Sequence, residues 1–223
     1  MRLDQPIARW QWGVDLLDRE IEGCAIVTEI CTAHAAVQDV LVRYQLAVGE
    51  SVTVVRVGST DGKSRSEVTI SFRTNGPLNG SELADRAAGQ LEGFCGERAI
   101  GSSDTHSWLS GNVDPRDADA STPMAFSLSV SCVAKYLVVT LETYIDVWMP
   151  YDLRGRSQPD LFTYNSPRLA AALQRISAVI GSEIDPCERS KLARATEVGV
   201  ENFFRENGEA EDTWYRYFGY PPG

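Results

Sequence analysis

The sequence predicts a single α+β domain in which a mainly antiparallel sheet carries its helices on one face. Segments with alternating apolar and polar residues follow one another in pairs, and segments with apolar residues every three or four positions lie between them. Paired strands joined by short turns are antiparallel, whereas a parallel sheet needs a crossover between strands. A length of 223 residues suits one large domain.

The first predicted elements are a helix and a strand hairpin. Residues 28–48 have the helical spacing of apolar side chains, and Gly49 is expected to end that helix. Residues 52–57 and 68–72 are rich in β-branched or alternating side chains and lie on either side of a short turn. We therefore expect these two segments to pair as a hairpin.

A second helix and a long connection follow the hairpin. Ser81 is expected to cap a helix that continues to about residue 94, where glycines at 93 and 96 end it. Residues 97–123 are rich in Ser, Asp, Gly and Pro and are expected to form a long irregular connection.

The second half is expected to contain two strands and a helix. Residues 126–132 alternate in polarity, and residues 137–147 carry a second row of apolar side chains. After a turn-rich link at 151–159, Pro167 is expected at the first helical position of a helix that ends at Gly181.

The order of these elements suggests a duplication. Residues 28–96 and 124–181 each contain two strands followed by a serine-capped helix, which is consistent with two repeated ββα units, although residue identity between them is low. Residues 187–223 are expected to form a helical and aromatic tail of the same domain.

Charge and cysteine usage restrict the class of protein. The chain has 31 acidic and 21 basic residues, which gives a net charge of −10. This charge argues against a nucleic-acid-binding protein, and an acidic surface suits a basic protein partner. We expect no signal sequence and no membrane segment. Five widely spaced cysteines are expected to be reduced thiols, which predicts a cytoplasmic protein.

Few residues suggest catalysis, a cofactor or a metal. Cys95 and His106, with Asp104, are weak candidates for a catalytic group, and no phosphate-binding glycine loop is present, so no cofactor is expected. Cys31 and His34 have a metal-like spacing, but His34 lies on an apolar helix face and is expected to be a buried histidine. The connection also carries acidic residues that are expected to be solvated rather than to bind a cation: Asp104, Asp114, Asp117 and Asp119.

Two stretches have the residue types enriched at protein interfaces, which are aromatic residues and arginine. The first stretch, at the end of a strand, contributes Trp148, Tyr151, Arg154 and Arg156. The second, in the tail, contributes Trp214 and Tyr217 beside the acidic residues Glu197, Glu201, Glu206, Glu209, Glu211 and Asp212. The alternative for the first stretch is the end of a sheet whose aromatics cover the core while its arginines pair with nearby acids. The alternative for the tail is a solvated helix face.

Two hypotheses for function remain. The first is a non-enzymatic protein that binds another protein, in the manner of immunity proteins or antitoxins, through acidic and aromatic surfaces. The second is a small-molecule-binding protein or enzyme with a pocket between the two halves and residues 97–123 as a lid. In that second case Glu142 and Arg154 join His106, Cys95 and Asp104 as candidates.

Overall fold

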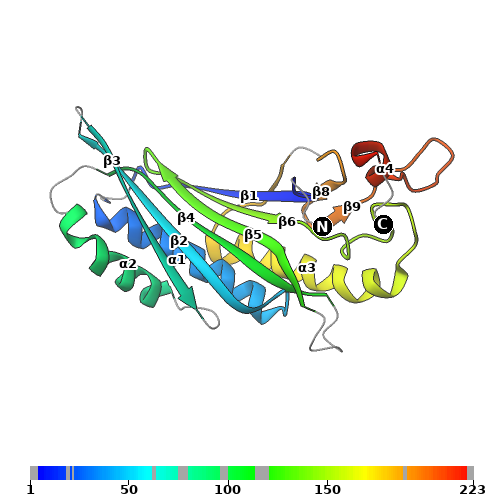
Figure 1. The fold of residues 1–223 in the computed structure, drawn as a ribbon, viewed down its shortest axis with the longest axis horizontal. Helices are drawn as coiled ribbons and strands as arrows, with labels where there is room; N and C mark the ends of the chain where they lie inside the picture. Colours follow the sequence, from blue (N-terminus) through cyan, green and yellow to red (C-terminus); the bar gives the residue numbers. More distant parts are fainter. Residues whose placement is uncertain are drawn as a thin grey trace.

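The computed structural model describes residues 5–18, 21, 23–61, 64–74, 80–95, 100–113, 121–187 and 190–219. Its main unit is a seven-stranded antiparallel sheet in the order β3-β2-β4-β5-β6-β1-β7, with helices packed on one face (Figure 1). This confirms the α+β class. The strands are β1 (Ala8–Asp15), β2 (Ala47–Asp61), β3 (Ser64–Thr74), β4 (Ile100–Asn112), β5 (Ser121–Val133), β6 (Tyr136–Thr143), β7 (Asp185–Pro186), β8 (Arg194–Thr196) and β9 (Gly199–Glu201). The helices are α1 (Cys24–Arg43), α2 (Gly80–Cys95), α3 (Pro159–Ile180) and α4 (Thr213–Phe218).

The core lies between the sheet and its helices. Alternation places Phe126, Leu128 and Val130 of β5 on the helix side, while the residues between them face the other way. Strand β1, which the sequence analysis missed, pairs along its whole length with β6. Its Trp10 and Trp12 are fully buried, and their indole N–H groups donate to the Thr196 carbonyl and the Ser177 hydroxyl, both at 2.8 Å.

Helix α1 is the central helix of the covered face. By length and composition it could cross a membrane, but its buried side packs on the sheet and it contacts α2 and α3, as a core helix does. The helix begins at Cys24 and ends at Arg43, so the predicted end at Gly49 is wrong, and Gly49 lies in β2 instead.

Strand β4 corrects the prediction of a long irregular connection at residues 97–123. It runs through the middle of the sheet and pairs with β2 on one side and β5 on the other. The error has a physical cause, because the buried positions of β4 include Ser103, Thr105 and Ser107, whose composition resembles a loop. Residues 114–120, with Asp114, Asp117 and Asp119, lie outside the described residues.

Two of these buried β4 residues, Thr105 and Ser107, have hydroxyl groups within hydrogen-bonding distance of a histidine. His34 of α1 is fully buried, with Nδ1 2.9 Å from the Thr105 hydroxyl and Nε2 2.8 Å from the Ser107 hydroxyl. The Ser107 hydroxyl also lies 2.8 Å from that of Thr53 on β2. This confirms His34 as a buried, hydrogen-bonded histidine, and the described residues contain no cluster of three or more metal-binding side chains.

Helix α3 begins earlier than expected. Its first residue is Pro159, so Pro167 lies inside the helix and not at its start. The preference for proline in the first helical turn is therefore met, but by a different proline. Similarly, β6 ends at Thr143, short of the expected residue 147.

The structure does not confirm a duplication. Strands β1 and β4 belong to neither predicted half, yet each is hydrogen-bonded between two other strands of the main sheet. Strands β8 and β9 form a separate small sheet that contacts β1 and α3, and their apolar residues join the same core.

Candidate functional site

The two stretches that the sequence analysis selected as separate surfaces form one surface, which we name the aromatic cap and define as residues 151–158 and 202–218. It lies at one end of the molecule, beside β8 and β9 (Figure 1). The side-chain amide of Asn202 donates to the Tyr151 carbonyl at 2.8 Å and accepts from the Tyr151 N–H at 3.1 Å. The Trp214 N–H donates to the Leu153 carbonyl at 2.9 Å, so both parts of the cap are joined through the backbone.

The loop of the cap is organised by two carboxylates. Asp152 accepts from the backbone N–H groups of Arg154 and Arg156, each at 2.9 Å, and from the Arg156 side chain at 3.0 Å. Asp146 accepts from the Leu153 N–H at 3.0 Å, and burial raises the pKa of the Asp146 carboxyl. These hydrogen bonds hold the turn in one conformation.

Gly155 is required where the two parts of the cap touch. Its φ of 72° lies in the left-handed region that favours glycine. A Cβ at this position would lie 2.8 Å from the Ala210 carbonyl oxygen, which belongs to the other part of the cap. Any larger residue at 155 therefore both strains its own backbone and pushes the two parts apart.

Helix α4 divides its aromatic residues between the core and the solvent. Asp212 caps the helix by accepting from the Tyr215 N–H at 2.7 Å, and Gly219 ends it in the left-handed conformation. Trp214 and Phe218 turn inward, with ring centroids 4.7 Å apart. Tyr215 and Tyr217 turn outward and are 64% and 37% exposed.

Phe204 is a third exposed aromatic residue of the cap. It is 52% exposed and meets the Tyr151 ring edge-on at 5.9 Å. The cap therefore presents three exposed aromatic side chains on a hydrogen-bonded base. Phe204 and Tyr215 were not among the predicted binding residues, although both stand in aromatic-rich stretches of the sequence.

Charge on the cap is nearly balanced. Arg216 pairs with Glu211, and Arg205 approaches Glu209 at 3.9 Å. The acidic excess of the tail is thus largely offset once the loop joins it. The charged residues of the cap are Asp152, Glu206, Glu209, Glu211 and Asp212 on one side and Arg154, Arg156, Arg205 and Arg216 on the other.

Trp148 is a correction to the predicted binding surface. Its side chain is 1% exposed, stacks against Phe126 at 5.4 Å and donates to the Thr143 hydroxyl at 2.8 Å. The indole fills the core because the chain turns inward just after β6, so Trp148 offers no surface to a partner. Tyr151 and Trp214 are half-buried, and Arg156 and Tyr217 are exposed.

Three of the predicted catalytic candidates lie on the face of the sheet opposite the helices. His106 Nε2 is 3.2 Å from the Ser127 hydroxyl, and Asp104 pairs with Arg56 at 3.0 Å. Glu142 pairs with Arg9 across β6 and β1 and accepts from the Tyr144 hydroxyl at 2.9 Å.

Burial is the largest influence on the titration of this cluster. It lowers the pKa of His106, as the nearby Arg56 does, while Glu142 and Asp104 oppose the shift. Burial raises the pKa of Asp104. The side chain of Cys95 lies outside the described residues, and Ser127 is buried, so the described groups do not form an accessible nucleophile with an oriented base.

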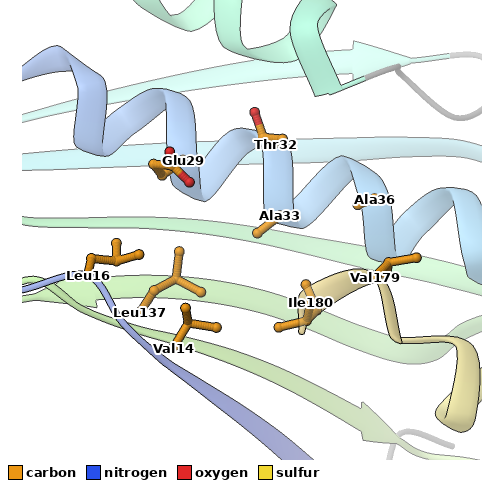
Figure 2. A pocket seen from close by; sticks show the side chains of 9 residues that line it. All are labelled: Val14, Leu16, Glu29, Thr32, Ala33, Ala36, Leu137, Val179 and Ile180. Atoms are coloured by element: carbon orange, nitrogen blue, oxygen red, sulfur yellow. The ribbon is translucent and has the colours of Figure 1, made fainter. Parts of the chain in front are cut away.

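A groove of about 210 Å³ lies elsewhere, between α1, α3 and the strands β1 and β6. Figure 2 shows aliphatic side chains of β1, β6 and α3 turned toward α1, which contributes Glu29 and Thr32. The groove joins the two predicted halves, but none of the catalytic candidates lines it. Residues 100–112 are a central strand, so that part of the predicted lid is wrong.

Disulfide bonding also differs from expectation. Cys24 is disulfide-bonded at the start of α1, which overturns the prediction that all five cysteines are reduced. Cys31, Cys132 and Cys187 are free, so the partner of Cys24 lies outside the described side chains.

Comparison with known proteins adds no assignment. No family model matches the chain, and no curated protein matches it.

Proposed function

We propose that this chain is a non-enzymatic protein that binds another protein through the aromatic cap. The observation that carries the proposal is the exposure of three aromatic side chains within the aromatic cap: Phe204 is 52%, Tyr215 64% and Tyr217 37% exposed. Aromatic side chains bury a large apolar area on binding and lose little conformational entropy, so they are enriched among the residues that dominate interface energies.

The base of the cap supports this proposal because it is organised before any partner arrives. The hydrogen bonds between Asn202 and Tyr151 hold the segment that carries Phe204, and the Asp212 cap holds the helix that carries both tyrosines. A preorganised surface loses less entropy on association than a loop that must first order.

The proposed mode of action is to cover a surface of the partner, as immunity proteins and antitoxins do. Because the charges on the cap nearly cancel, its aromatic residues supply the affinity for the partner protein. The net charge of −10 acts at longer range and favours encounter with a basic protein.

The test compares partners captured by the wild-type chain and by a cap variant in which Phe204, Tyr215 and Tyr217 are each replaced by Ser. A control variant carries Leu17→Ser and Val133→Ser, which change exposed apolar residues outside the cap. We expect a protein in native lysate that the wild type and the control retain and the cap variant loses. Its affinity for the purified cap variant should fall at least about a hundredfold, since each aromatic contributes ~1–2 kcal/mol or more.

Equal capture by the cap variant and the wild type would contradict the cap as the binding surface. Circular dichroism and thermal unfolding of the variant check that its fold is retained. These controls separate the loss of a binding surface from the loss of structure.

The groove between α1, α3 and the sheet favours a second candidate function, the binding of a small and mainly aliphatic molecule. Ala33→Leu would fill the groove from α1. If this alternative is right, a ligand that stabilises the wild type in a thermal-shift screen will not stabilise Ala33→Leu, and cap variants will respond as the wild type does.

Cellular location belongs to the same set of proposals. The expectation of a cytoplasmic protein rested partly on the expectation of reduced thiols. The disulfide at Cys24 favours an oxidising compartment instead. Fractionation of the source cells, followed by thiol labelling of the native chain before and after reduction, distinguishes the two.

A further inference from the structure

Strand β3 forms one edge of the seven-stranded sheet. It pairs with β2 along its length, and no described strand pairs with its other side. In an antiparallel strand every second residue directs its backbone N–H and C=O groups away from the neighbour, so this side of β3 offers a row of hydrogen-bonding groups to another strand.

Between its two charged ends, Glu67 and Arg73, this part of β3 lacks several of the devices that block such an edge. It contains no proline and no lysine, and its register with β2 is continuous without a bulge. The side chains alternate regularly: the odd-numbered residues are exposed and polar, while Val68, Ile70 and Phe72 are apolar and at least partly buried on the helix side.

We propose that β3 pairs antiparallel with β3 of a second copy of this chain about a two-fold axis at Ile70. In this register Glu67 of one copy faces Arg73 of the other, Thr69 faces Ser71, and Val68 faces Phe72. Ile70 faces the same residue of the partner. Each of the three unlike pairs occurs twice by symmetry and the Ile70 pair occurs once, so the edge is complementary to itself in charge, hydroxyl and apolar character.

The charges select this register. Neither Glu67 nor Arg73 has an ion-pair partner within the described part of the chain, and both are exposed beside the edge. A slip by one residue would place polar side chains opposite apolar ones on the wrong face. A slip by two residues would keep the faces but separate both pairs of opposite charges.

The self-complementarity of this edge identifies a second copy of the chain as its partner. An extended segment of an unrelated protein could use the same backbone groups, but it has no reason to carry the reversed order of charges and apolar residues. A second copy carries that order by necessity. The dimer leaves the aromatic cap free, because the cap lies beside β8 and β9 and not beside β3.

Sedimentation equilibrium over a wide range of protein concentration tests the proposal with purified full-length chain. We expect the wild type to associate to twice the mass of one chain. Glu67→Arg and Arg73→Glu should each weaken the dimer by about tenfold or more, since each turns two attractive pairs into repulsive ones. The double variant Glu67→Arg/Arg73→Glu should restore it.

Glu183→Arg is the matched control, because it makes the same charge change at an exposed residue away from β3. It should leave the dimer unchanged. A wild type that remains monomeric at the highest soluble concentration would overturn the proposal, and so would a dimer that Glu67→Arg and Glu183→Arg weaken equally.

Cysteine cross-linking tests the register itself. In a Cys187→Ser background, which removes the only described free cysteine that is not buried, Ile70→Cys should form a covalent dimer under mild oxidation. Thr69→Cys and Ser71→Cys should each cross-link poorly alone and well when the two variants are mixed. Cross-linking of Thr69→Cys alone at the rate of Ile70→Cys would reject this register.

Discussion

His34 is fully buried between α1 and the sheet. Burial, with a smaller effect from His106, lowers the pKa of His34 to about 3, so the ring is neutral in the folded protein. It links α1 to β4 through the hydroxyls of Thr105 and Ser107. Protonation would place an unpaired charge in the core, which the fold resists until the pH is far below the ordinary pKa of histidine.

This environment predicts a loss of stability in acid. In the unfolded chain His34 takes up a proton near pH 6.5, whereas the folded chain does so only near pH 3. Between these values the unfolded state binds more protons, so the free energy of unfolding falls as the pH falls, by up to about 1.4 kcal/mol per pH unit. Urea unfolding from pH 7 to about pH 4 measures this slope.

His34→Gln is the matched variant, because the amide can still bond both hydroxyls but does not titrate. It should show a shallower slope in the same range. His106→Gln provides a comparison, since His106 also titrates with a lowered pKa but is only partly buried. Equal slopes for wild type and His34→Gln would contradict the assigned role of His34.

Single residues also show what the sequence could and could not predict. The apolar spacing around His34 correctly predicted its burial. Its hydrogen-bond partners could not be predicted, because they come from a segment whose serines and threonines are typical of a loop. Trp148 was misplaced for a related reason, since the same residue type serves cores and interfaces and only burial distinguishes them.

At the scale of elements, strands with one apolar face were predicted well and strands with a mixed face were not. The hairpin of β2 and β3 and the strands β5 and β6 are confirmed because their apolar residues alternate. Strand β4 places hydroxyls toward the core, and His34 is a hydrogen-bond partner of two of them, those of Thr105 and Ser107. These are tertiary contacts, which local sequence does not record.

The joint between the two parts of the aromatic cap gives a prediction at the same scale. Gly155→Ala should lower the free energy of unfolding by about 2–4 kcal/mol, since it combines an unfavourable φ with a contact against the Ala210 carbonyl. Gly181→Ala is the control: its φ of 73° is nearly the same, but a Cβ there meets nothing within 4 Å. It should cost only about 1 kcal/mol.

Limited trypsin digestion shows where Gly155→Ala acts. Cleavage after Arg205, in the outer part of the cap, should become faster in Gly155→Ala and should stay slow in Gly181→Ala. Similar stability and similar digestion of the two variants would show that the contact with Ala210 does not hold the cap together.

At the scale of the whole molecule, the disulfide at Cys24 fixes the start of the central helix. Its reduction should lower the free energy of unfolding by about 2–4 kcal/mol, because the cross-link restricts the unfolded chain. Thermal unfolding with and without reductant measures the effect. Cys24→Ser should unfold like the reduced wild type and no longer respond to reductant, whereas Cys187→Ser should keep the full response.

The cap illustrates the limit of prediction for the whole molecule. The first segment was selected from its aromatic and arginine content and the second from its acidic and aromatic content, yet they are separated by α3 and the small sheet. Composition selected the two segments, but it did not select Phe204 and Tyr215, and it could not show that the Asn202–Tyr151 and Trp214–Leu153 hydrogen bonds join the segments. The balance of charge on the cap became visible only after the segments were placed together.

The pairing of β1 with β6 determines when this protein can complete its fold. Ala8 lies opposite Thr143, so the first strand of the chain must wait for residues more than half the sequence away. Until β6 is available, Trp10 and Trp12 remain without their buried site. Such distant pairing slows folding and leaves apolar surface open to association with other chains during synthesis.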